Sequence, residues 1–428
     1  MRQEFNLIDE PWIPCVSLDG QVRELSLRDA LRSAHEQRDI GGDSALATAA
    51  LYRLLLAILH RVFGPPGYDA WHALWQARRL DATAIDRYLS QWRERFDLFH
   101  PERPFYQAGD PRVTPKSVVR LVLDAASGNN ATLFDHHTES DGMALTPAAS
   151  ARALLVAQAF GLAGLSGLEQ KFTDGPCARG IIFLVHGATL FETLLLNLIR
   201  YPDDRAMPIT GGDRPAWEMD DPYDGNRQTP LGYLDYLTWQ NRRVLLLPST
   251  EGGRPVVREV TMAPGLRLAE GVLDAMKHYT VRDEKRGPQP LRFREGRALW
   301  RDSSVLFRLQ ASDQRPPWAL DWVYDLSENG CVDPVVARRF LALGMANDQA
   351  KVEFFRTEQM PISLSYLTDE RAIAHLDNAL QMAEGVRNQL WGATHTMAVL
   401  AISPDADQDG AIGNGPDEAR ALVEHWPV

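Results

Sequence analysis

The chain has 428 residues, 45% of them hydrophobic, and a formal net charge of −12. Because this length exceeds what one hydrophobic core usually serves, we expect a large domain and a second, smaller one. The acidic balance argues against binding nucleic acid over a wide basic surface, so any such contact must be local or shared with partner subunits.

The sequence shows no feature of a secreted or membrane protein. Its first residues, MRQEFNLIDE, lack the pattern of a signal peptide. The apolar run over residues 181–199 is interrupted by His186 and Glu192, so it is not expected to span a bilayer. The three cysteines are odd in number and far apart, which argues against a disulfide framework and against a zinc cluster. We therefore expect a cytoplasmic protein without membrane contact.

Strand and turn signals open the chain. Residues 5–25 predict a short strand, an extended segment interrupted by proline, a turn at Asp19-Gly20 and a second strand. Ser26, followed three residues later by Asp29, forms a capping box that predicts the start of a helix.

Three helices are predicted next. Asp43 and Ser44 can cap a helix over residues 44–63, whose apolar residues cover most faces and indicate deep burial, and Gly64 ends it. Two amphipathic helices follow, over YDAWHALWQARRL and ATAIDRYLSQWRERF. Their aromatic residues favour core packing over a ligand site.

Residues 123–146 are polar and rich in glycine and asparagine around the island Leu-Phe-Asp-His-His. Phe134, Asp135 and His136 are typical of a segment that becomes ordered on binding nucleic acid. The alternative is a metal cluster from Asp135 to Asp141 that supports hydrolysis. We favour the first interpretation, because adjacent histidines diverge in an extended chain and no helical His-x-x-x-His pair is present.

The stretch FGLAGLSGLEQKFTDGPCARG, residues 160–180, is rich in glycine and has no helix or strand pattern. We call it the glycine loop. Thr146 and Pro147 predict a helix that ends where the loop begins, and IIFLVHG predicts a strand that leads into an apolar helix after it. A loop fixed at both ends is a common place for function, although a surface loop without a role is the alternative.

The glycine spacing matches none of the common ligand motifs. It differs from the dinucleotide fingerprint, lacks the last glycine of a nucleophile elbow, and is not followed by the lysine-serine or lysine-threonine pair of a phosphate loop. Because glycine allows close approach of the backbone to another molecule, we take Gly161, Gly164, Ser166 and Gly167 as candidate contact residues.

Charge is unevenly distributed in the second half of the chain. Residues 281–301 carry seven basic and three acidic side chains, whereas the chain from Ser403 onward carries six acidic side chains and one arginine. Residues 281–301, which we call the basic hairpin, can simply form a solvent-exposed surface, as charged segments often do. The alternative is that they contact nucleic acid.

Four stretches of the chain resemble one known family. They are FNLIDEPWIP (residues 5–14), FDLFHPERPFYQ (96–107), GYLDYLTWQNRR (232–243) and FLALGMANDQAKVEF (340–354). In these stretches the chain resembles CasA, the large subunit of the type I-E CRISPR surveillance complex Cascade. The motifs span most of the chain, and the first, with two prolines and a tryptophan, is fairly specific.

The resemblance implies a division of labour in which guide RNA reads the target by base pairing and this subunit reads a short flanking motif on duplex DNA. In the family, a mobile loop that approaches the duplex stands at the position of Phe134, Asp135 and His136. The family also places a DNA-contacting basic side chain in the basic hairpin, for which Lys285 and Arg286 are the candidates.

Residues 340–354 resemble the family's strand–turn–strand element, which carries a glutamine wedge. Asn347-Asp348-Gln349-Ala stands where the family commonly has Asn-Asn-Gln-Ala, so Gln349 takes the wedge position. Asp348 is a departure, because an acid that faces phosphates repels them. The Cys-x-x-Cys pairs of some relatives are absent, so structural zinc is not expected.

The C-terminal part predicts one long amphipathic helix from Ser363 to Ser403 and a second, short one over PDEARALVEHW. The family ends in a four-helix bundle, and this chain has room for about two of those helices. Between them, Asp405 to Asp409 imitates a calcium loop, but Pro416 replaces the glutamate that calcium requires. We expect a solvated acidic loop there.

We therefore predict an α+β protein, with a large mixed domain of short strands and helices over residues 1–362 and a partial helical bundle over residues 363–428. We expect a non-catalytic, cofactor-free subunit of an RNA-guided antiviral complex that recognises the protospacer-adjacent motif through the minor groove and helps to open the target strands. Its expected partners are the guide-RNA complex, duplex DNA, other Cascade subunits and a recruited helicase-nuclease. The alternatives are a metal-dependent hydrolase and a purely structural scaffold.

Overall fold

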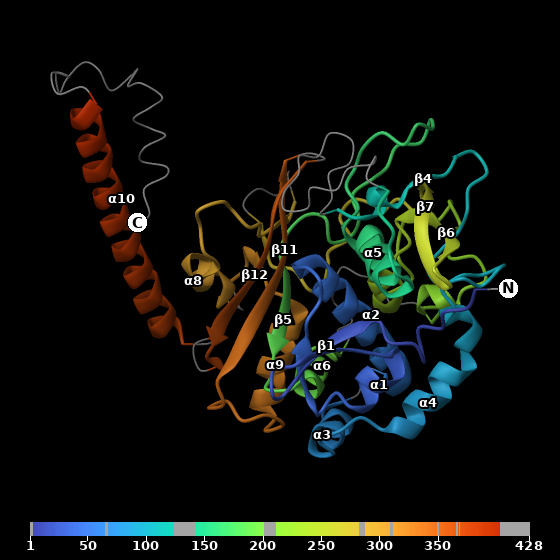
Figure 1. Cartoon of the computed structure of the whole chain (residues 1–428). Coiled ribbons are helices and arrows are strands. Elements are labelled where there is room, and N and C mark those ends of the chain that lie inside the picture. The colour runs from blue at the N-terminus through green and yellow to red at the C-terminus, as the bar shows by residue number, and fades with distance from the viewer. Residues whose placement is uncertain are drawn as a thin grey trace.

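The computed structural model describes residues 3–64, 67–123, 142–200, 211–281, 287–308, 311–348, 351–364, 367 and 369–402 (Figure 1). It consists of helices packed around several small sheets, and every strand pair in these ranges is antiparallel. The prediction of an α+β fold is confirmed.

The α-helices are α1 (Leu27–Arg32), α2 (Ala45–Phe63), α3 (Tyr68–Gln76), α4 (Ala82–Gln91), α5 (Pro147–Phe160), α6 (Leu190–Leu196), α7 (Tyr233–Leu237), α8 (Ser303–Leu306), α9 (Trp318–Glu328) and α10 (Glu370–Ile402). The 3₁₀ helices are η1 (Arg93–Phe96), η2 (Val118–Leu121), η3 (Ala216–Glu218) and η4 (Leu299–Asp302). The strands are β1 (Ile13–Ser17), β2 (Val22–Leu25), β3 (Gln37–Ile40), β4 (Lys116–Ser117), β5 (Ile182–His186), β6 (Arg242–Glu251), β7 (Arg254–Pro264), β8 (Tyr279–Thr280), β9 (Gln289–Pro290), β10 (Gln314–Arg315), β11 (Arg338–Asp348) and β12 (Lys351–Ile362).

Local capping signals place the helix starts as the sequence predicts. Ser26 accepts a hydrogen bond from the Asp29 N–H at the start of α1, and Ser44 does the same for the Ala47 N–H at the start of α2. Each side chain satisfies a backbone donor that the first helical turn leaves without a partner. Gly64, with a φ of 72°, ends α2 in a conformation that residues with a side chain rarely adopt.

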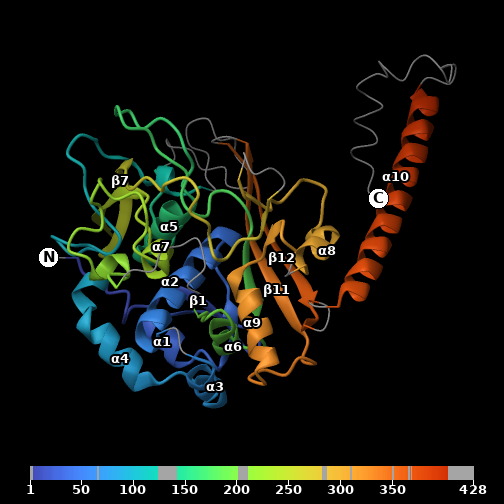
Figure 2. The same cartoon turned by 180° about the vertical axis from the view of Figure 1, so that it is seen from behind.

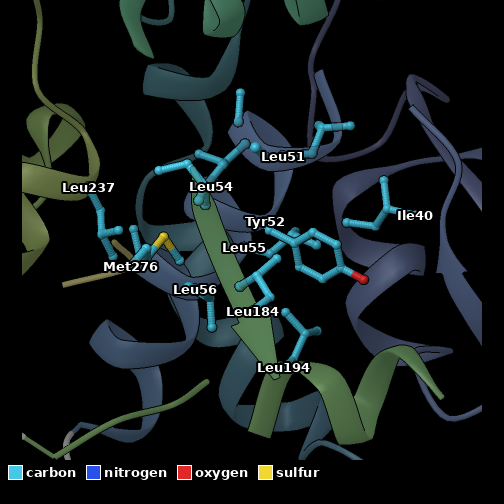
Figure 3. Close-up of a cluster of buried hydrophobic side chains, with 14 of the residues drawn as sticks. Ile40, Leu51, Tyr52, Leu54, Leu55, Leu56, Leu184, Leu194, Leu237 and Met276 are labelled. Carbon is cyan, nitrogen blue, oxygen red and sulfur yellow. The ribbon is translucent and has the colours of Figure 1, made fainter. Parts of the chain in front are cut away.

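Helix α2 forms the centre of the core. Figure 3 shows its leucines and Tyr52 packed against Leu184 of β5, Leu194 of α6 and Leu237 of α7. Arg53, buried in this helix, forms an ion pair with buried Asp274 at 3.1 Å and donates to the Tyr236 carbonyl. Removing either partner would leave an uncompensated charge in the core, which is strongly destabilising.

One finding differs from the expectation about membrane spans. Helix α2 is long and apolar enough to cross a bilayer, whereas the sequence analysis found no such run. In the folded chain, however, 83% of its most apolar window is buried inside the protein. Helix α2 is therefore the core helix of a globular fold. Such a helix can be as long and as apolar as one that crosses a membrane.

Two sheets position the glycine loop. One has the strand order β12-β11-β5, and the other has the order β4-β7-β6. Helix α5 leads into the loop and strand β5 leads out of it. Because β5 pairs with β11, with Ile182 opposite Leu343, the exit of the loop lies beside the hairpin formed by β11 and β12.

Helix α10 stands apart from the body of the molecule (Figures 1 and 2). It begins at Glu370, later than the predicted Ser363, because β12 continues to Ile362 and Asp369 is the residue that caps the helix. Its first turns are tied to the body by ion pairs, with Arg308 to Asp377 and with Arg297 and Arg301 to Glu384. Beyond these turns its side chains are mostly exposed.

Candidate nucleic-acid interface

The glycine loop begins at a position that only glycine can occupy. A Cβ atom on Gly161 would lie 2.6 Å from the Ala157 carbonyl oxygen and 2.8 Å from Nη2 of Arg242. Contacts this short are essentially never seen for a real Cβ, so a larger residue would push the loop away from α5. Gly161 therefore sets where the chain leaves the helix.

Arg242, at the start of β6, braces both sides of the loop. Its guanidinium donates to the Leu162 carbonyl at 2.7 Å and to the Thr173 carbonyl at 2.8 Å. It also lies over the ring of Phe172, 4.7 Å from the centroid. Burial lowers the pKa of Arg242 to about 10, which leaves the side chain charged at neutral pH.

Further hydrogen bonds join the first and second halves of the loop, so that the two halves run side by side. Gly164 and Phe172 exchange backbone hydrogen bonds of 3.0 and 3.2 Å, and the Gly175 N–H donates to the Gly161 carbonyl. Asp174 accepts from the Ala163 N–H at 2.8 Å. The loop has no regular secondary structure inside it, as predicted, but its backbone is held in one conformation.

The tip of the loop is shaped by Ser166 and Gly167. The Ser166 hydroxyl accepts from the Leu168 N–H and donates to the Gln170 carbonyl, so it serves the turn itself. Gly167 has a φ of 81°, which favours glycine. Leu165 next to them is 86% exposed. The tip therefore projects from the protein, at the upper edge of Figure 1, where the chain follows α5.

A hollow of about 480 Å³ lies beside the glycine loop. Apolar side chains of the loop and of β7 line it, including Leu162, Phe172 and Met262. Its lining also includes the basic residues Arg112, Lys116 and Arg120. The sequence analysis missed these three; the signal was the basic residue at every fourth position of PRVTPKSVVR.

The hairpin of β11 and β12 has a regular register from Arg338 opposite Ile362 to Asp348 opposite Lys351, with one irregularity between Ala346 and Asn347. The two strands of the predicted strand–turn–strand element are thus present, and the residues between them lie outside the described ranges. Gln349 and the side chain of Asp348 lie outside the described residues, and the Asn347 side chain is half-buried.

The chain matches proteins of one family along almost its whole length. The sequence model of the family "CRISPR-associated protein Cse1" matches residues 6–423. A curated relative, the CRISPR-associated protein CasA/Cse1 of Thermus thermophilus, is 37% identical over 443 residues, covering 100% of this chain and 84% of the relative. These matches decide the family.

The chain belongs to the Cse1 (CasA) family.

Solved structures agree with this assignment. Cse1 of Thermobifida fusca superposes with a TM-score of 0.80 at 29% identity, covering 98% of this chain and 85% of that one. A chain of a CRISPR RNA-guided surveillance complex superposes with a TM-score of 0.73 at 25% identity, covering 99% of this chain and 90% of that one. As a Cse1 protein, the chain is the large subunit of a type I-E Cascade complex.

Several predicted site residues of this Cse1 protein lie outside the described residues. They are Phe134, Asp135, His136, Lys285 and Arg286, together with the Asp135–Asp141 cluster and the Asp405–Asp409 loop. Within the described ranges no group of histidine, cysteine, aspartate and glutamate is arranged to hold a metal ion. The structure brings together Gly161, Gly164, Ser166 and Gly167 in one loop and places the Asn347 end of the hairpin on the sheet that the loop enters.

Proposed function

We propose that this Cse1 protein recognises the motif flanking the target on duplex DNA by inserting its glycine loop into the minor groove. The observation that carries the proposal is the loop itself, a projecting and backbone-rich structure that Arg242 and Asp174 hold rigid. A rigid backbone that has glycine at Gly164 and Gly167, on either side of the exposed Leu165, can approach the floor of a narrow groove at a low entropic cost. The basic residues Lys116 and Arg120 in the lining of the hollow suit the phosphates that border the groove, whereas Arg112 there is already paired with Asp110 at 2.6 Å.

The proposed mode of reading also determines its selectivity. In the minor groove, A·T and T·A pairs present nearly the same acceptors, and only the guanine amino group distinguishes G·C pairs. Recognition through backbone groups should therefore tolerate several related motifs. Guide RNA supplies the remaining specificity through base pairing, and this subunit performs no chemical step.

The hairpin of β11 and β12 would act directly after recognition. Strand β11, which leads to the hairpin turn, pairs with β5 at the exit of the glycine loop, and we propose that the turn acts at the base pair next to the motif. A neutral amide such as Gln349 can fill the space of an opened pair without the desolvation cost of a charge. The opened complex would then recruit the helicase-nuclease.

Helix α10 offers a separate surface for neighbouring Cascade subunits. Its residues Val386, Leu390, Met397 and Leu400 follow one another at intervals of four, seven and three, which keeps them on one side of the helix, and they are 42–71% exposed. This spacing is that of a helix that packs lengthwise against another helix. We assign this exposed stripe to assembly of the complex, which is also the role that a pure scaffold would have.

Gly164→Ala tests DNA recognition without disturbing the fold. An added Cβ at Gly164 meets no atom within 4 Å, so the variant should fold and assemble normally. The added methyl group would nevertheless lie between the loop backbone and the floor of the groove. We therefore expect the assembled complex to bind a duplex with the flanking motif about tenfold more weakly, which corresponds to about 1.4 kcal/mol. Gly67→Ala, equally unhindered and at the start of α3, is the matched control. Equal affinities of the two variants would contradict the proposal.

A further inference from the structure

The stretch FDLFHPERPFYQ (residues 96–107), which has no part in the proposed function, lines a hollow of about 240 Å³. The lining includes three arginines: Arg95 of η1, Arg103 of this stretch and Arg243 of β6. We call it the arginine hollow. Neighbouring side chains of a strand point to opposite faces, so Arg243 points away from the glycine loop, which Arg242 contacts. The arginine hollow and the glycine loop therefore lie on different sides of β6.

Most polar side chains in the lining already have hydrogen-bond partners within the protein. They are Gln107, Trp217, Asp221, Tyr223 and Gln240. The capacity that is left for a ligand lies mainly with the three guanidinium groups, which can only donate hydrogen bonds. The remaining carboxylates, of Glu102 and Asp220, belong to exposed residues. A ligand of the arginine hollow must therefore accept hydrogen bonds.

The arginines of the hollow also favour a negative charge. Arg95 and Arg243 are half-buried, and neither forms an ion pair in the part of the chain that the structure describes. Each donates a hydrogen bond to a backbone carbonyl, at 2.7 and 3.1 Å. Arg103 lies 4.0 Å from Asp220, but the carboxylate is fully exposed, so water screens this pair. Burial and then the charge of Arg103 lower the pKa of Arg95, and Asp220 opposes them. An oxyanion would relieve this repulsion between neighbouring cations.

A second hollow, of about 560 Å³, adjoins the first, because Arg95 and Arg103 line both. Its lining adds Arg93, which is already in an ion pair, together with His100 and the exposed Glu94. One carboxylate of a protein side chain would occupy only one of the two hollows, whereas a nucleic-acid strand can place successive phosphates in both. Grooves that follow the backbone in this way are typical of proteins that bind single strands.

We propose that Arg95, Arg103 and Arg243 bind backbone phosphates of the guide RNA in these two hollows. The inference goes beyond the proposed function, which gives this subunit no contact with the RNA, and rests on it only for the presence of guide RNA in the complex. Because a guanidinium is planar and presents parallel N–H groups, it fits the oxygens of a phosphate well. Such contacts would hold the subunit on a guide of any sequence, since phosphates carry no sequence information.

The test measures how tightly the labelled subunit binds the complex of guide RNA and the other Cascade subunits, in a salt series. Arg95→Gln and Arg103→Gln should each weaken binding about threefold to tenfold near 0.1 M salt and reduce the slope of log affinity against log salt by about 0.7, the value for one single-strand phosphate. Arg79→Gln is the matched control, an exposed arginine that lines neither hollow. Melting temperatures verify folding, and Arg103→Gln, at an exposed position, should fold as the parent does.

Modified guide RNAs identify the phosphates. Single phosphates are replaced in turn by uncharged methylphosphonates, and one position should weaken binding of the parent subunit while leaving that of Arg103→Gln unchanged. If Arg95→Gln and Arg103→Gln both bind like Arg79→Gln, the inference is wrong. If the two variants bind weakly but every methylphosphonate acts equally on parent and variants, the oxyanion belongs to a protein subunit, and the assignment to RNA is wrong. DNA binding by Gly164→Ala decides the proposed function separately, because that variant should join the complex normally.

Discussion

At the scale of single residues, buried side chains of the β-strands and helices determine the shape of a loop that is itself exposed. Arg242 lies in the first position of β6, yet its hydrogen bonds go to Leu162 and Thr173 on the two sides of the glycine loop. Gln158 in α5 secures Arg242 in turn, by accepting from its backbone N–H at 2.8 Å. The conformation of the loop thus depends on side chains outside the loop, and the loop sequence alone does not indicate them.

His60 should make the fold sensitive to acid. Complete burial in α2 lowers the pKa of His60 to about 3, from the usual 6.5. Below pH 6.5 the unfolded chain binds a proton here that the folded chain binds only near pH 3, so stability is lost as the pH falls through this window. The loss from this group is on the order of a few kcal/mol.

The measurement is the free energy of unfolding of the parent and of His60→Phe between pH 7 and pH 4. Phe keeps a ring edge-on to Tyr233, whose centroid lies 5.3 Å from that of His60, and it does not titrate. The variant should lose less stability on acidification than the parent. Parallel curves for the two proteins would show that His60 does not titrate between these states.

At the scale of secondary-structure elements, the β12-β11-β5 sheet joins two functional candidates that are far apart in the sequence. Strand β5 leaves the glycine loop, and β11 leads to the hairpin turn. Gly344 of β11 lies against the loop exit, since a Cβ there would be 3.3 Å from the Gly180 carbonyl oxygen. The β12-β11-β5 sheet therefore packs directly against the exit of the loop.

Gln349→Ala should reduce strand opening without changing assembly. Unstacking a base step costs on the order of a few kcal/mol, and the wedge side chain is expected to supply contacts that offset this cost. The complex with Gln349→Ala should therefore bind an intact duplex much more weakly than the parent does, and it should recover on a duplex with a pre-opened bubble beside the motif. Unchanged affinity for both duplexes would show that Gln349 is only a turn residue.

Leu390→Glu should impair assembly of the complex. The substitution places a charge in the exposed stripe of α10, where Leu390 is 51% exposed in this chain alone, so the isolated protein should keep its melting temperature. Burying that charge against a partner helix would be costly, and copurification with the other Cascade subunits should drop. Asn388→Glu adds the same charge on the opposite face of the helix and serves as the control. Equal copurification of both variants would show that α10 does not contribute to the assembly surface.

At the scale of the whole molecule, the net charge determines how strongly the isolated subunit binds DNA. The net charge of −12 repels DNA at long range, while the basic residues beside the glycine loop attract it locally. The isolated subunit should therefore bind duplex DNA weakly, and the assembled complex should bind it much more tightly. Binding isotherms of the lone chain across a salt series check this, and tight, steeply salt-dependent binding would contradict a local contact.

The sequence by itself determined the features that depend on neighbouring residues. Thr146 and Pro147 start α5 where predicted, Phe160 ends it, and residues 182–186 form the predicted strand after the loop. Caps, apolar periodicity and glycine act over a few residues, so a short window of sequence is sufficient to detect them. The family motifs were equally readable, and the family assignment is confirmed.

Only the tertiary structure decided which distant residues meet. No local pattern indicates that Arg242 contacts both sides of the glycine loop, or that the segment before Ile181 lies beside the segment of Leu291. The late start of α10 has the same origin, because Ser363 and Leu364 follow directly from a β12 that is held in place by pairing with β11. Contacts of this kind arise from packing and sheet pairing between segments far apart in the chain, and local propensity carries no information about them.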